Sequence, residues 1–583
     1  CKRNELQKEL RQAKGAERTA VWLRFKKARN RCINLVRRDN KSYIKNVLNT
    51  HSTSPRDVWK LADTINSNDI PTKIHLMENG QEITEDDKVA QVLNEYFKSK
   101  ISSLRGKVDS SKRRDPTGPL KAKKIKSHLA FKPVSEAIVE KKIRSLKNKA
   151  SSGKDGITSK ILKDASSVLV LPLTQIINAS IRSGCFPSEW KEAQISPILK
   201  KGAATDKSNY RPVSLLSVAS KVCEMVVHDQ LSAYFEKNKL LPHNQHGFRK
   251  NRSTTTALTS VCSHIFSEQQ KGHHVALASY DLTAAFDCLD AEILDEKLEL
   301  YGLSLISRSW IKSFLSNRKQ FVKVGNGRSL TIDIDFGSPQ GSILSPLLYL
   351  IFVADLELWL SEGVSSLYAD DIALATSDKT PEDSIRRLET ASAEILDFLA
   401  SNLLVANPAK TAFFVIRNVN NKVKYTLKMD GERIEESDTI TLLGAVLSKD
   451  MSWSKHVKGL LSSLRSSTGL ISRLANYIPN RCLTPLIHGL MLSKVRYALP
   501  LFADIRLNDA DASSSLMKDI QIEINKGLRI VVGVRLSDRM SIAKLLSQVG
   551  VSSVNQLAAE VTLTEIWKSL KQDTPVSTYF TWL

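Results

Sequence analysis

The sequence predicts a large mixed α+β protein that begins with a basic, helical region. Its 583 residues, of which 42% are apolar, are enough for several domains with cores, at ~150 residues per domain. Short apolar runs that end at turn residues, such as residues 275–281 and 372–376, are typical of buried strands. Apolar residues at three-and-four spacing near the N-terminus, and leucine-rich segments after Lys458, are typical of amphipathic helices.

Positive charge is concentrated near the N-terminus. The chain carries 85 Lys and Arg against 61 Asp and Glu, which gives a net charge of +24. Residues 1–130 hold 30 Lys and Arg against 15 Asp and Glu, so +15 of the +24 lies in less than a quarter of the length. Such a block indicates a polyanionic partner, with nucleic acid the first candidate and a membrane surface the second. We expect residues 1–130 to form a basic, mostly helical extension and linker.

Two interpretations of the first helical segment stay open. The apolar residues that follow the helical spacing are Trp22, Phe25, Ala28, Cys32 and Leu35. A helix that contacts RNA or DNA and a solvated helix that packs on a neighbour fit this pattern equally well. Residues 102–126, which contain Gly, Pro and clusters of basic residues, predict an exposed linker.

Cysteine usage and hydropathy indicate the compartment. The seven cysteines form no CxxC pair and no zinc-ligand spacing with the 11 histidines, so we expect buried thiols in a reducing environment. The longest apolar run, residues 343–354, is shorter than the ~20 residues of a membrane span. We therefore expect an intracellular protein without a membrane partner. Because the first residue is Cys1 rather than Met, we also expect a piece of a longer reading frame.

The middle of the chain alternates between helical and extended patterns. Ser135 is a candidate N-cap for a helix up to residue 146. A helix over residues 161–181 and a short strand over residues 195–199 follow, and residues 344–360 predict an apolar helix.

Two adjacent acids, Asp370 and Asp371, stand at the tip of a predicted hairpin whose strands are residues 364–367 and 372–376. In a buried setting such a pair costs several kcal/mol, roughly, unless a counter-charge is present. A divalent cation such as Mg²⁺ is the simplest counter-charge, because it prefers hard oxygen ligands. A solvated polar turn is the alternative interpretation, since Asp is common in turns.

A third acid is expected to join this pair. Asp281 ends the strand over residues 275–281, and ligands of mixed sheets gather where strands end. Asp287 lies in residues 282–287, which predict the start of a helix. We expect Asp287 to complement that helix dipole rather than to bind a ligand.

Basic and glycine-rich motifs lie on either side of Asp281. Arg249 and Arg252 are three residues apart and precede two hydroxyl residues, a pattern that suits a triphosphate because guanidinium groups match phosphate oxygens. A Gly-Gln-Gly turn centred on Gln340 follows later in the chain. Three carboxylates, two basic groups and this turn together fit nucleotidyl transfer with two metal ions about 4 Å apart.

In this order the motifs resemble a reverse transcriptase of the LINE-type, non-LTR retrotransposon class, nearer to jockey and CR1-like elements than to group II intron maturases. The resemblance covers roughly residues 150–450. The residues that carry it are NYRPVS at 209–214, GFR and RST within 247–254, D and FD within 281–287, GSPQGSILSP at 337–346, YADD at 368–371, NPAKT at 407–411 and LLG at 442–444.

The resemblance implies a right-hand polymerase fold. Fingers and palm are expected in residues 131–450, and a helical thumb with the C-terminal region in residues 451–583. Asp281, Asp370 and Asp371 match the family's metal-binding catalytic triad, with the backbone carbonyl of Leu282 assisting. Two Mg²⁺ ions, for which Mn²⁺ can substitute, are the implied cofactors.

Further matches concern the incoming nucleotide. Lys410 matches a catalytic lysine that protonates pyrophosphate, and Gln340 matches a residue that touches the nucleotide. Phe286 matches the aromatic gate that crowds a ribose 2′-hydroxyl, although a core phenylalanine is the alternative. The implied triphosphate contacts are Arg249, Arg252 and Lys221, and Arg211 grips the template or serves the fold.

The implied activity is RNA-directed DNA synthesis that copies element RNA from a target-site primer. The implied partners are the RNA template, the DNA primer and target DNA, and dNTPs. The implied locations are the cytoplasm, with element RNA, and the nucleus, where integration occurs. A catalytically inactive RNA-binding relic and an RNA-directed RNA polymerase are the alternatives. We expect an endonuclease upstream of Cys1, whereas the oligomeric state, template and target site leave no pattern in the sequence.

Overall fold

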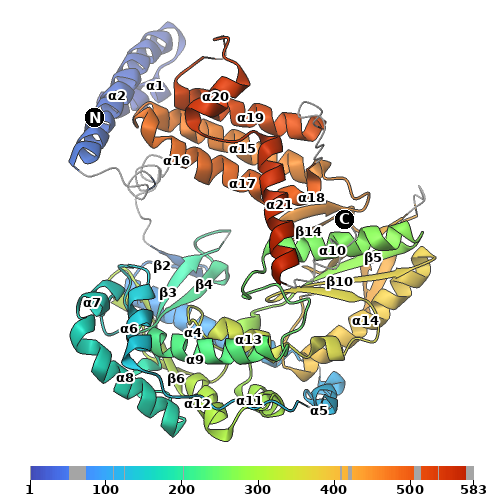
Figure 1. Ribbon diagram of the computed structural model, residues 1–583. Coiled ribbons are helices and arrows are strands. Elements are labelled where there is room, and N and C mark those ends of the chain that lie inside the picture. Colours follow the sequence, from blue (N-terminus) through green and yellow to red (C-terminus); the bar gives the residue numbers. More distant parts are fainter. Residues whose placement is uncertain are drawn as a thin grey trace. The chain divides into compact units, whose positions relative to one another are not determined.

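The computed structural model describes residues 2–50, 59, 74–108, 110–123, 125–200, 202–407, 410–417, 423–503, 514–535 and 537–572 (Figure 1). The chain divides into two compact units. One unit comprises Cys1–Pro71 and Trp453–Thr564, and the other comprises Thr72–Ser452 and Glu565–Leu583. The later boundary lies close to residue 450, whereas the earlier one lies at Pro71 rather than near residue 130.

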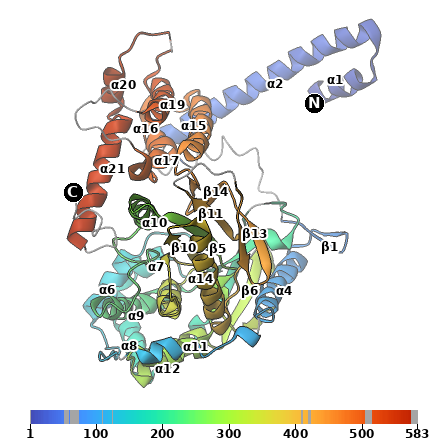
Figure 2. The same cartoon turned by 90° about the vertical axis from the view of Figure 1, so that its right-hand side faces the viewer.

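A four-stranded antiparallel sheet forms the centre of the second unit (Figure 2). Its strands lie in the order β11-β5-β10-β9. Their bounds are β5 His274–Asp281, β9 Val364–Tyr368, β10 Asp371–Asp378 and β11 Ala412–Ile416. The local apolar patterns therefore predicted three of these strands to within a few residues.

Two helices cover opposite faces of this sheet, α10 (Thr254–Gln270) and α14 (Pro381–Ser401). On β10 the Ser377 hydroxyl donates to Glu268 of α10, while the neighbouring Thr376 hydroxyl donates to the Ser384 carbonyl of α14. Successive side chains of a strand point to opposite faces, so these two bonds assign one helix to each face. The odd-numbered residues of β5 and β10 belong to the α10 face, and they include Asp281 at the end of β5 and Asp371 at the start of β10.

A second sheet has the order β4-β3-β6-β7, and β8 also pairs with β6. Its strands are β3 Glu192–Leu199, β4 Tyr210–Leu215, β6 Arg318–Val324, β7 Gly327–Arg328 and β8 Ile332–Ile334. Helix α4 (Asp86–Arg105) packs on it, with Leu93 and Phe97 buried in one cluster with Ile195 and Val322. Part of the expected N-terminal extension is therefore built into this sheet's core.

The expected linker over residues 102–126 is not uniformly exposed. Arg105 pairs with Asp290 at 2.5 Å, and both side chains are largely buried. Leu120, in the short helix α5 (Gly118–Ala122), is only 1% exposed and belongs to the main core. The prediction of an exposed linker was wrong here because these few side chains anchor a sequence that is otherwise rich in turn residues.

The main core of this unit is largely helical. The helices are α6 Glu136–Ser145, α7 Ser159–Asp164, α8 Ser166–Ser183, α9 Val218–Lys237, α11 Ala291–Leu300, α12 Leu305–Leu315 and α13 Ser345–Phe352. An aromatic cluster around Trp310 packs α12 against the segment between α8 and β3, with Phe186 at 5.5 Å and edge-on. The apolar helix predicted over residues 344–360 ends earlier, because α13 stops at Phe352 and a separate 3₁₀ turn follows at Leu356–Leu358.

Small hairpins complete the described strands of the second unit. They pair β1 (Leu76–Glu78) with β2 (Gln81–Ile83), β12 (Thr426–Met429) with β13 (Glu432–Glu435), and β14 (Thr439–Leu442) with β15 (Ala445–Ser448).

The first unit is helical in all the segments that the structure describes. Its helices are α1 Lys2–Gln12, α2 Gly15–Thr50, α15 Ser454–Ala475, α16 Thr484–Ile487, α17 Ser493–Arg496, α18 Leu499–Phe502, α19 Ser515–Val532 and α20 Ile542–Val549, followed by α21 Val554–Gln572. Helices α15 and α19 pack on each other, and Arg465 pairs with Glu523 at 3.2 Å. The helical patterns predicted near both termini are confirmed.

Two bulk expectations can be compared with the described residues. Among them, no helix is both long enough and apolar enough to cross a bilayer. The described cysteines are free thiols, and Cys223, Cys262, Cys288 and Cys482 are buried. Cys185 is exposed and Cys32 is half-buried, so the expectation of uniformly buried thiols was too general.

Candidate active site

The turn between β9 and β10 carries Asp370. Strand β9 ends at Tyr368 and β10 begins at Asp371, so Ala369 and Asp370 make the turn. Ala369 has a left-handed backbone with φ of 57°, which is uncommon for a residue with a Cβ. Its N–H donates to the side-chain carbonyl of the fully buried Gln245 at 3.0 Å, and this bond supports the unfavourable conformation.

Residues 244–247 run beside β9 and support the same turn. The Leu367 N–H donates to the Asn244 carbonyl at 3.0 Å, and the His246 N–H donates to the Leu367 carbonyl at 2.7 Å. A Cβ on Gly247 would lie 2.4 Å from the Ala369 nitrogen, so only glycine fits there. The sequence motif that predicted triphosphate binding starts at residue 247. In the structure, the backbone of residues 244–247 instead holds the turn that carries Asp370.

Asp281 lies directly across the sheet from Asp371. The two are register partners on β5 and β10, so their side chains leave the same face of the sheet. The Asp281 carbonyl accepts from the Asn407 N–H at 2.9 Å, which fixes the end of β5 against the loop that carries Lys410. The Lys410 ammonium donates to Asp281 Oδ2 at 2.6 Å. The three acids expected from the sequence are thus neighbours, with Lys410 beside them.

Burial and the neighbouring carboxylates raise the pKa values of Asp370 and Asp371. Burial, followed by the charge of Asp281, raises the pKa of Asp370. Burial, followed by the charges of Asp370 and Asp281, raises the pKa of Asp371 to about 6. A cation placed among the three carboxylates would relieve this repulsion. The Lys410 ammonium already supplies one positive charge to Asp281.

The carboxylates of Asp281 and Asp370 suit a divalent cation whose remaining ligands come from a substrate phosphate and water. In the described part of the chain, no three His, Cys, Asp or Glu side chains make a metal site by themselves. Magnesium commonly takes only one or two carboxylates, with substrate phosphates and waters completing its shell. Asp281 and Asp370 open into one cavity, and Leu282 lines it too, so the residues present fit an ion of this kind.

That cavity has a volume of about 600 Å³, and four basic residues line it together with the acids. The basic residues that line it are Lys100, Lys200, Arg211 and Lys410. Asp287, Phe286 and Gln340 also line it, whereas Asp371, the half-buried register partner of Asp281, is not among the lining residues. Acids that favour a cation and bases that favour an anion therefore face one space, which is the arrangement that a metal-bound phosphate compound requires.

Lys200 and Arg211 come together through strand pairing. Strands β3 and β4 are antiparallel, with Ile198 opposite Arg211, and the Lys200 N–H donates to the Asn209 carbonyl at 2.8 Å. The Arg211 charge, then burial, then the Lys410 charge lower the pKa of Lys200. Cations that oppose one another's charge in this way are a ready site for a polyanion.

Phe286 stands at the wall of the cavity. It lies in a 3₁₀ turn, Ala285–Asp287, after Ala284, whose φ is 51°. Its ring packs on Tyr349 with centroids 4.5 Å apart, and burial followed by the Asp370 charge raises the pKa of Tyr349 well above its usual value. Phe286 is thus both packed against the core and exposed to the cavity, so the two interpretations of this residue are compatible.

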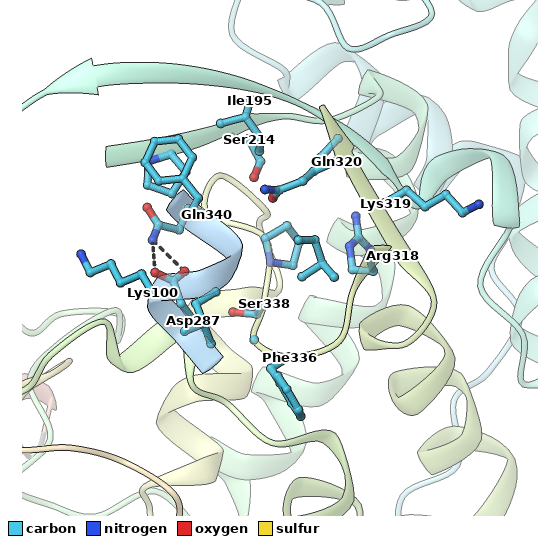
Figure 3. A pocket seen from close by; sticks show the side chains of 17 residues that line it. Lys100, Ile195, Ser214, Asp287, Arg318, Lys319, Gln320, Phe336, Ser338 and Gln340 are labelled. Carbon is cyan, nitrogen blue, oxygen red and sulfur yellow. Dashed lines mark hydrogen bonds between the residues drawn. The ribbon is translucent and has the colours of Figure 1, made fainter. Parts of the chain in front are cut away.

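The Gly-Gln-Gly turn is held between Asp287 and β4. The Gln340 amide nitrogen donates to both Asp287 oxygens at 2.8 Å, as the dashed lines of Figure 3 show. The Gln340 carbonyl accepts from the Ser214 N–H at 2.8 Å. Burial raises the pKa of Asp287 to about 6. The expectation that Asp287 complements a helix dipole was wrong, because the predicted helix is a single 3₁₀ turn and the carboxylate instead binds Gln340.

Comparison with known proteins bears on this arrangement. Residues 198–447, from the end of β3 to β15, match the family described as Reverse transcriptase (RNA-dependent DNA polymerase). The matched segment contains the three acids, Lys200, Arg211 and Lys410. The chain carries a reverse transcriptase domain.

The relatives of this domain include proteins of mobile elements. It is 29% identical over 350 residues to the probable RNA-directed DNA polymerase from transposon BS of Drosophila melanogaster, covering 57% of this chain and 38% of that protein. It is 28% identical over 345 residues to the RNA-directed DNA polymerase from mobile element jockey of Drosophila funebris, with shares of 57% and 37%. The chain therefore spans about two fifths of the length of these relatives.

The reverse transcriptase domain does not bring the expected triphosphate residues to the acids. Arg249 donates to both oxygens of Glu236, at 2.8 and 2.6 Å, and lines a separate cavity. Arg252 lines the same second cavity and donates to the Gln245 carbonyl at 3.2 Å. Lys221 lies on α9 near Glu224, and burial lowers its pKa. These three residues therefore lie outside the carboxylate cavity, where Lys200 and Arg211 supply the positive charge instead.

Proposed function

We propose that this chain is the RNA-directed DNA polymerase of a non-LTR retrotransposon. It would copy element RNA into DNA from a primer at the target site, with dNTPs as substrates. In this proposal the sheet β11-β5-β10-β9 is the palm, the sheet of β3, β4 and β6 belongs to the fingers, and the helices of residues 453–564 are the thumb. RNA would be met in the cytoplasm and target DNA in the nucleus.

One observation carries the proposal. Within a domain of the reverse transcriptase family, one cavity is lined both by acids at the ends of two adjacent strands and by Lys200 and Arg211. Transfer of a nucleotidyl group needs mainly positioning and charge neutralisation, so this combination supports polymerisation more than simple RNA binding.

Asp281 and Asp370, together with the adjacent Asp371, would hold two divalent cations, which we take to be Mg²⁺. These ions would neutralise charge on the attacking and leaving oxygens. Lys200 and Arg211 would bind the triphosphate, because they line the same cavity as the acids and their charges act on Asp370. Lys410 would move from Asp281 once cations are bound and donate a proton to the departing pyrophosphate.

A change at Arg211 tests the triphosphate contact. We expect Arg211→Ala to raise the KM for dNTPs by about 10- to 100-fold, because one hydrogen-bonded charge contact to phosphate is lost. Arg211→Lys should recover part of the loss. Arg328→Ala, at an exposed arginine outside the cavity, is the control. Steady-state incorporation of one dNTP measures the effect, and an unchanged KM in Arg211→Ala would remove this assignment.

A change at Phe286 tests the proposed selection of the sugar. We expect Phe286→Val to raise incorporation of ribonucleotides relative to deoxynucleotides by about tenfold, since a clash worth about 1–2 kcal/mol is relieved. The ratio of kcat/KM for rNTP and dNTP measures it. Phe266→Val, at an exposed phenylalanine on α10, is the matched control. Unaltered sugar discrimination would return Phe286 to a purely packing role.

The direct test of the function uses a DNA primer annealed to an RNA template. We expect the purified chain to extend the primer to the end of the template with dNTPs and Mg²⁺, and to stop when EDTA removes the cation. Synthesis from rNTPs alone would instead identify an RNA-directed RNA polymerase. Template binding without extension would identify a non-catalytic RNA-binding protein.

A further inference from the structure

A second basic cavity lies around the loop of residues 242–252. Its volume is about 470 Å³. Lys123, Lys239 and Lys250 line it with exposed side chains. Of its two acids, Glu236 is paired with Arg249, and the other is the exposed Glu357, on which the charge of Lys123 acts. The cavity therefore keeps an excess of positive charge, which is a footprint for phosphate groups.

Phe248, on the same loop, contacts Phe286 at the wall of the carboxylate cavity. Its side chain is 58% exposed, although exposure of a large aromatic ring is unfavourable. Its backbone is left-handed, with φ of 53°, a conformation that costs of order 1–3 kcal/mol in a residue with a Cβ. The ring meets Phe286 edge-on, with centroids 6.1 Å apart. Packing within the protein therefore does not explain why Phe248 is exposed on a strained backbone.

The loop connects the two cavities physically. Phe248 touches Phe286, which lines the carboxylate cavity, and the next four residues line the basic cavity. Gly247 at the start of the loop packs on Ala369, in the turn that bears Asp370. A chain molecule bound along this loop would consequently be held at a fixed distance from Asp370.

We propose that the loop binds the unpaired RNA template strand, with one base stacked on Phe248 and its phosphates held by Lys123, Lys239 and Lys250. An exposed aromatic ring beside basic groups is the combination that recognises single strands, because an unpaired base offers a free π-face. A duplex stacks its bases on one another and offers no such face along its length. The choice of RNA rests on the proposed function, in which RNA is the copied strand.

The first test compares binding of two primer–templates, one with a single-stranded 5′ RNA overhang and one with blunt ends. We expect Phe248→Asn to weaken binding of the overhang by about fivefold or more, the loss expected for one stacked base, and to leave blunt-duplex binding unchanged. Asn accepts the left-handed backbone, so folding is preserved. Phe248→Trp should bind as the natural chain does. Phe266→Asn, on the exposed Phe266 of α10, is the control.

The second test measures the salt dependence of overhang binding. Replacing Lys123, Lys239 and Lys250 together by Ala should reduce the slope of log K against log salt by about 2, which corresponds to three phosphates on a single strand. Replacing the exposed Lys132, Lys141 and Lys160, which line neither cavity, should leave the slope unchanged.

The outcomes separate this inference from the proposed function. Overhang binding that depends on Phe248 without primer extension would support the template site and contradict the polymerase. The opposite outcome is primer extension by the natural chain, with unchanged overhang affinity in Phe248→Asn and an unchanged salt slope in the variant that lacks Lys123, Lys239 and Lys250. It would support the polymerase and overturn the template site.

Discussion

Asp370→Asn is expected to reduce primer extension by about 10³-fold or more, because several kcal/mol of transition-state charge stabilisation would be lost with the cation that this carboxylate holds. Asn preserves the size of the side chain, and Asp370 lies in a turn whose backbone is fixed by Gln245 and Gly247. Folding and affinity for primed template should therefore stay close to those of the natural chain. Single-turnover extension with saturating dNTP measures the effect.

Asp378→Asn is the matched control for that experiment. Asp378 ends the same strand, β10, at the edge away from the turn, and pairs with Arg387 at 2.8 Å. Removing a partly exposed ion pair costs at most about 1 kcal/mol, so extension should be unaffected. Equal extension rates in the Asp370 and Asp378 variants would contradict the proposed catalytic centre.

The second large effect concerns stability. Lys297 of α11 and Asp355 after α13 are both 0% exposed, and their ammonium and carboxylate groups lie 2.6 Å apart. Asp355→Ala would leave the ammonium buried without its partner, and we expect a loss of about 3–5 kcal/mol in the free energy of unfolding. Denaturant unfolding followed by a probe in residues 72–452 measures it, because the chain has more than one compact unit.

A double substitution separates a lost ion pair from a cavity. Lys297→Met combined with Asp355→Leu removes both charges and keeps apolar volume, so most of the stability should return. Glu292→Ala breaks the exposed pair with Lys312 and should change stability by less than about 1 kcal/mol. If Asp355→Ala unfolds at the same denaturant concentration as the natural chain, the pair does not stabilise this core.

Sequence patterns predicted the strands beside the three acids well. The strand predicted over residues 275–281 is β5, and the predicted hairpin is β9 and β10, each displaced by no more than a few residues. Apolar runs bounded by turn residues report local conformation directly, since burial of both sheet faces leaves few other options. The convergence of Asp281 with Asp370 and Asp371 follows from these strands once they are paired.

The pairing of Lys200 with Arg211 was not predicted, for a different reason. Lys200 and Arg211 are polar residues at strand ends, and no local pattern distinguishes them from other exposed basic residues. Only the antiparallel register of β3 and β4 brings them together. A signal did exist, because a strand of residues 195–199 followed by a second extended run at 210–215 predicts a hairpin with both side chains at one edge.

The segment at residues 244–252 illustrates a limit of motif reading. Its two arginines suggested a triphosphate site, yet the segment pairs with Leu367, more than a hundred residues away along the chain. The guanidinium group of Arg249 binds Glu236, and that of Arg252 donates to the Gln245 carbonyl. Such long-range pairing leaves no periodic signal in one sequence, so the residue types were recognised and their partners were not.

The proposed two-metal centre is tested most directly by the number of Mn²⁺ ions that the three acids bind. Electron paramagnetic resonance measures this number in the complex with primed RNA and a non-reactive dNTP analogue. We expect about two ions per natural chain, as two-metal transfer requires. Asp370→Asn should lose at least one of them, while Asp378→Asn keeps both. Equal Mn²⁺ binding by the natural chain and by Asp370→Asn would contradict the metal centre on which the proposed polymerase depends.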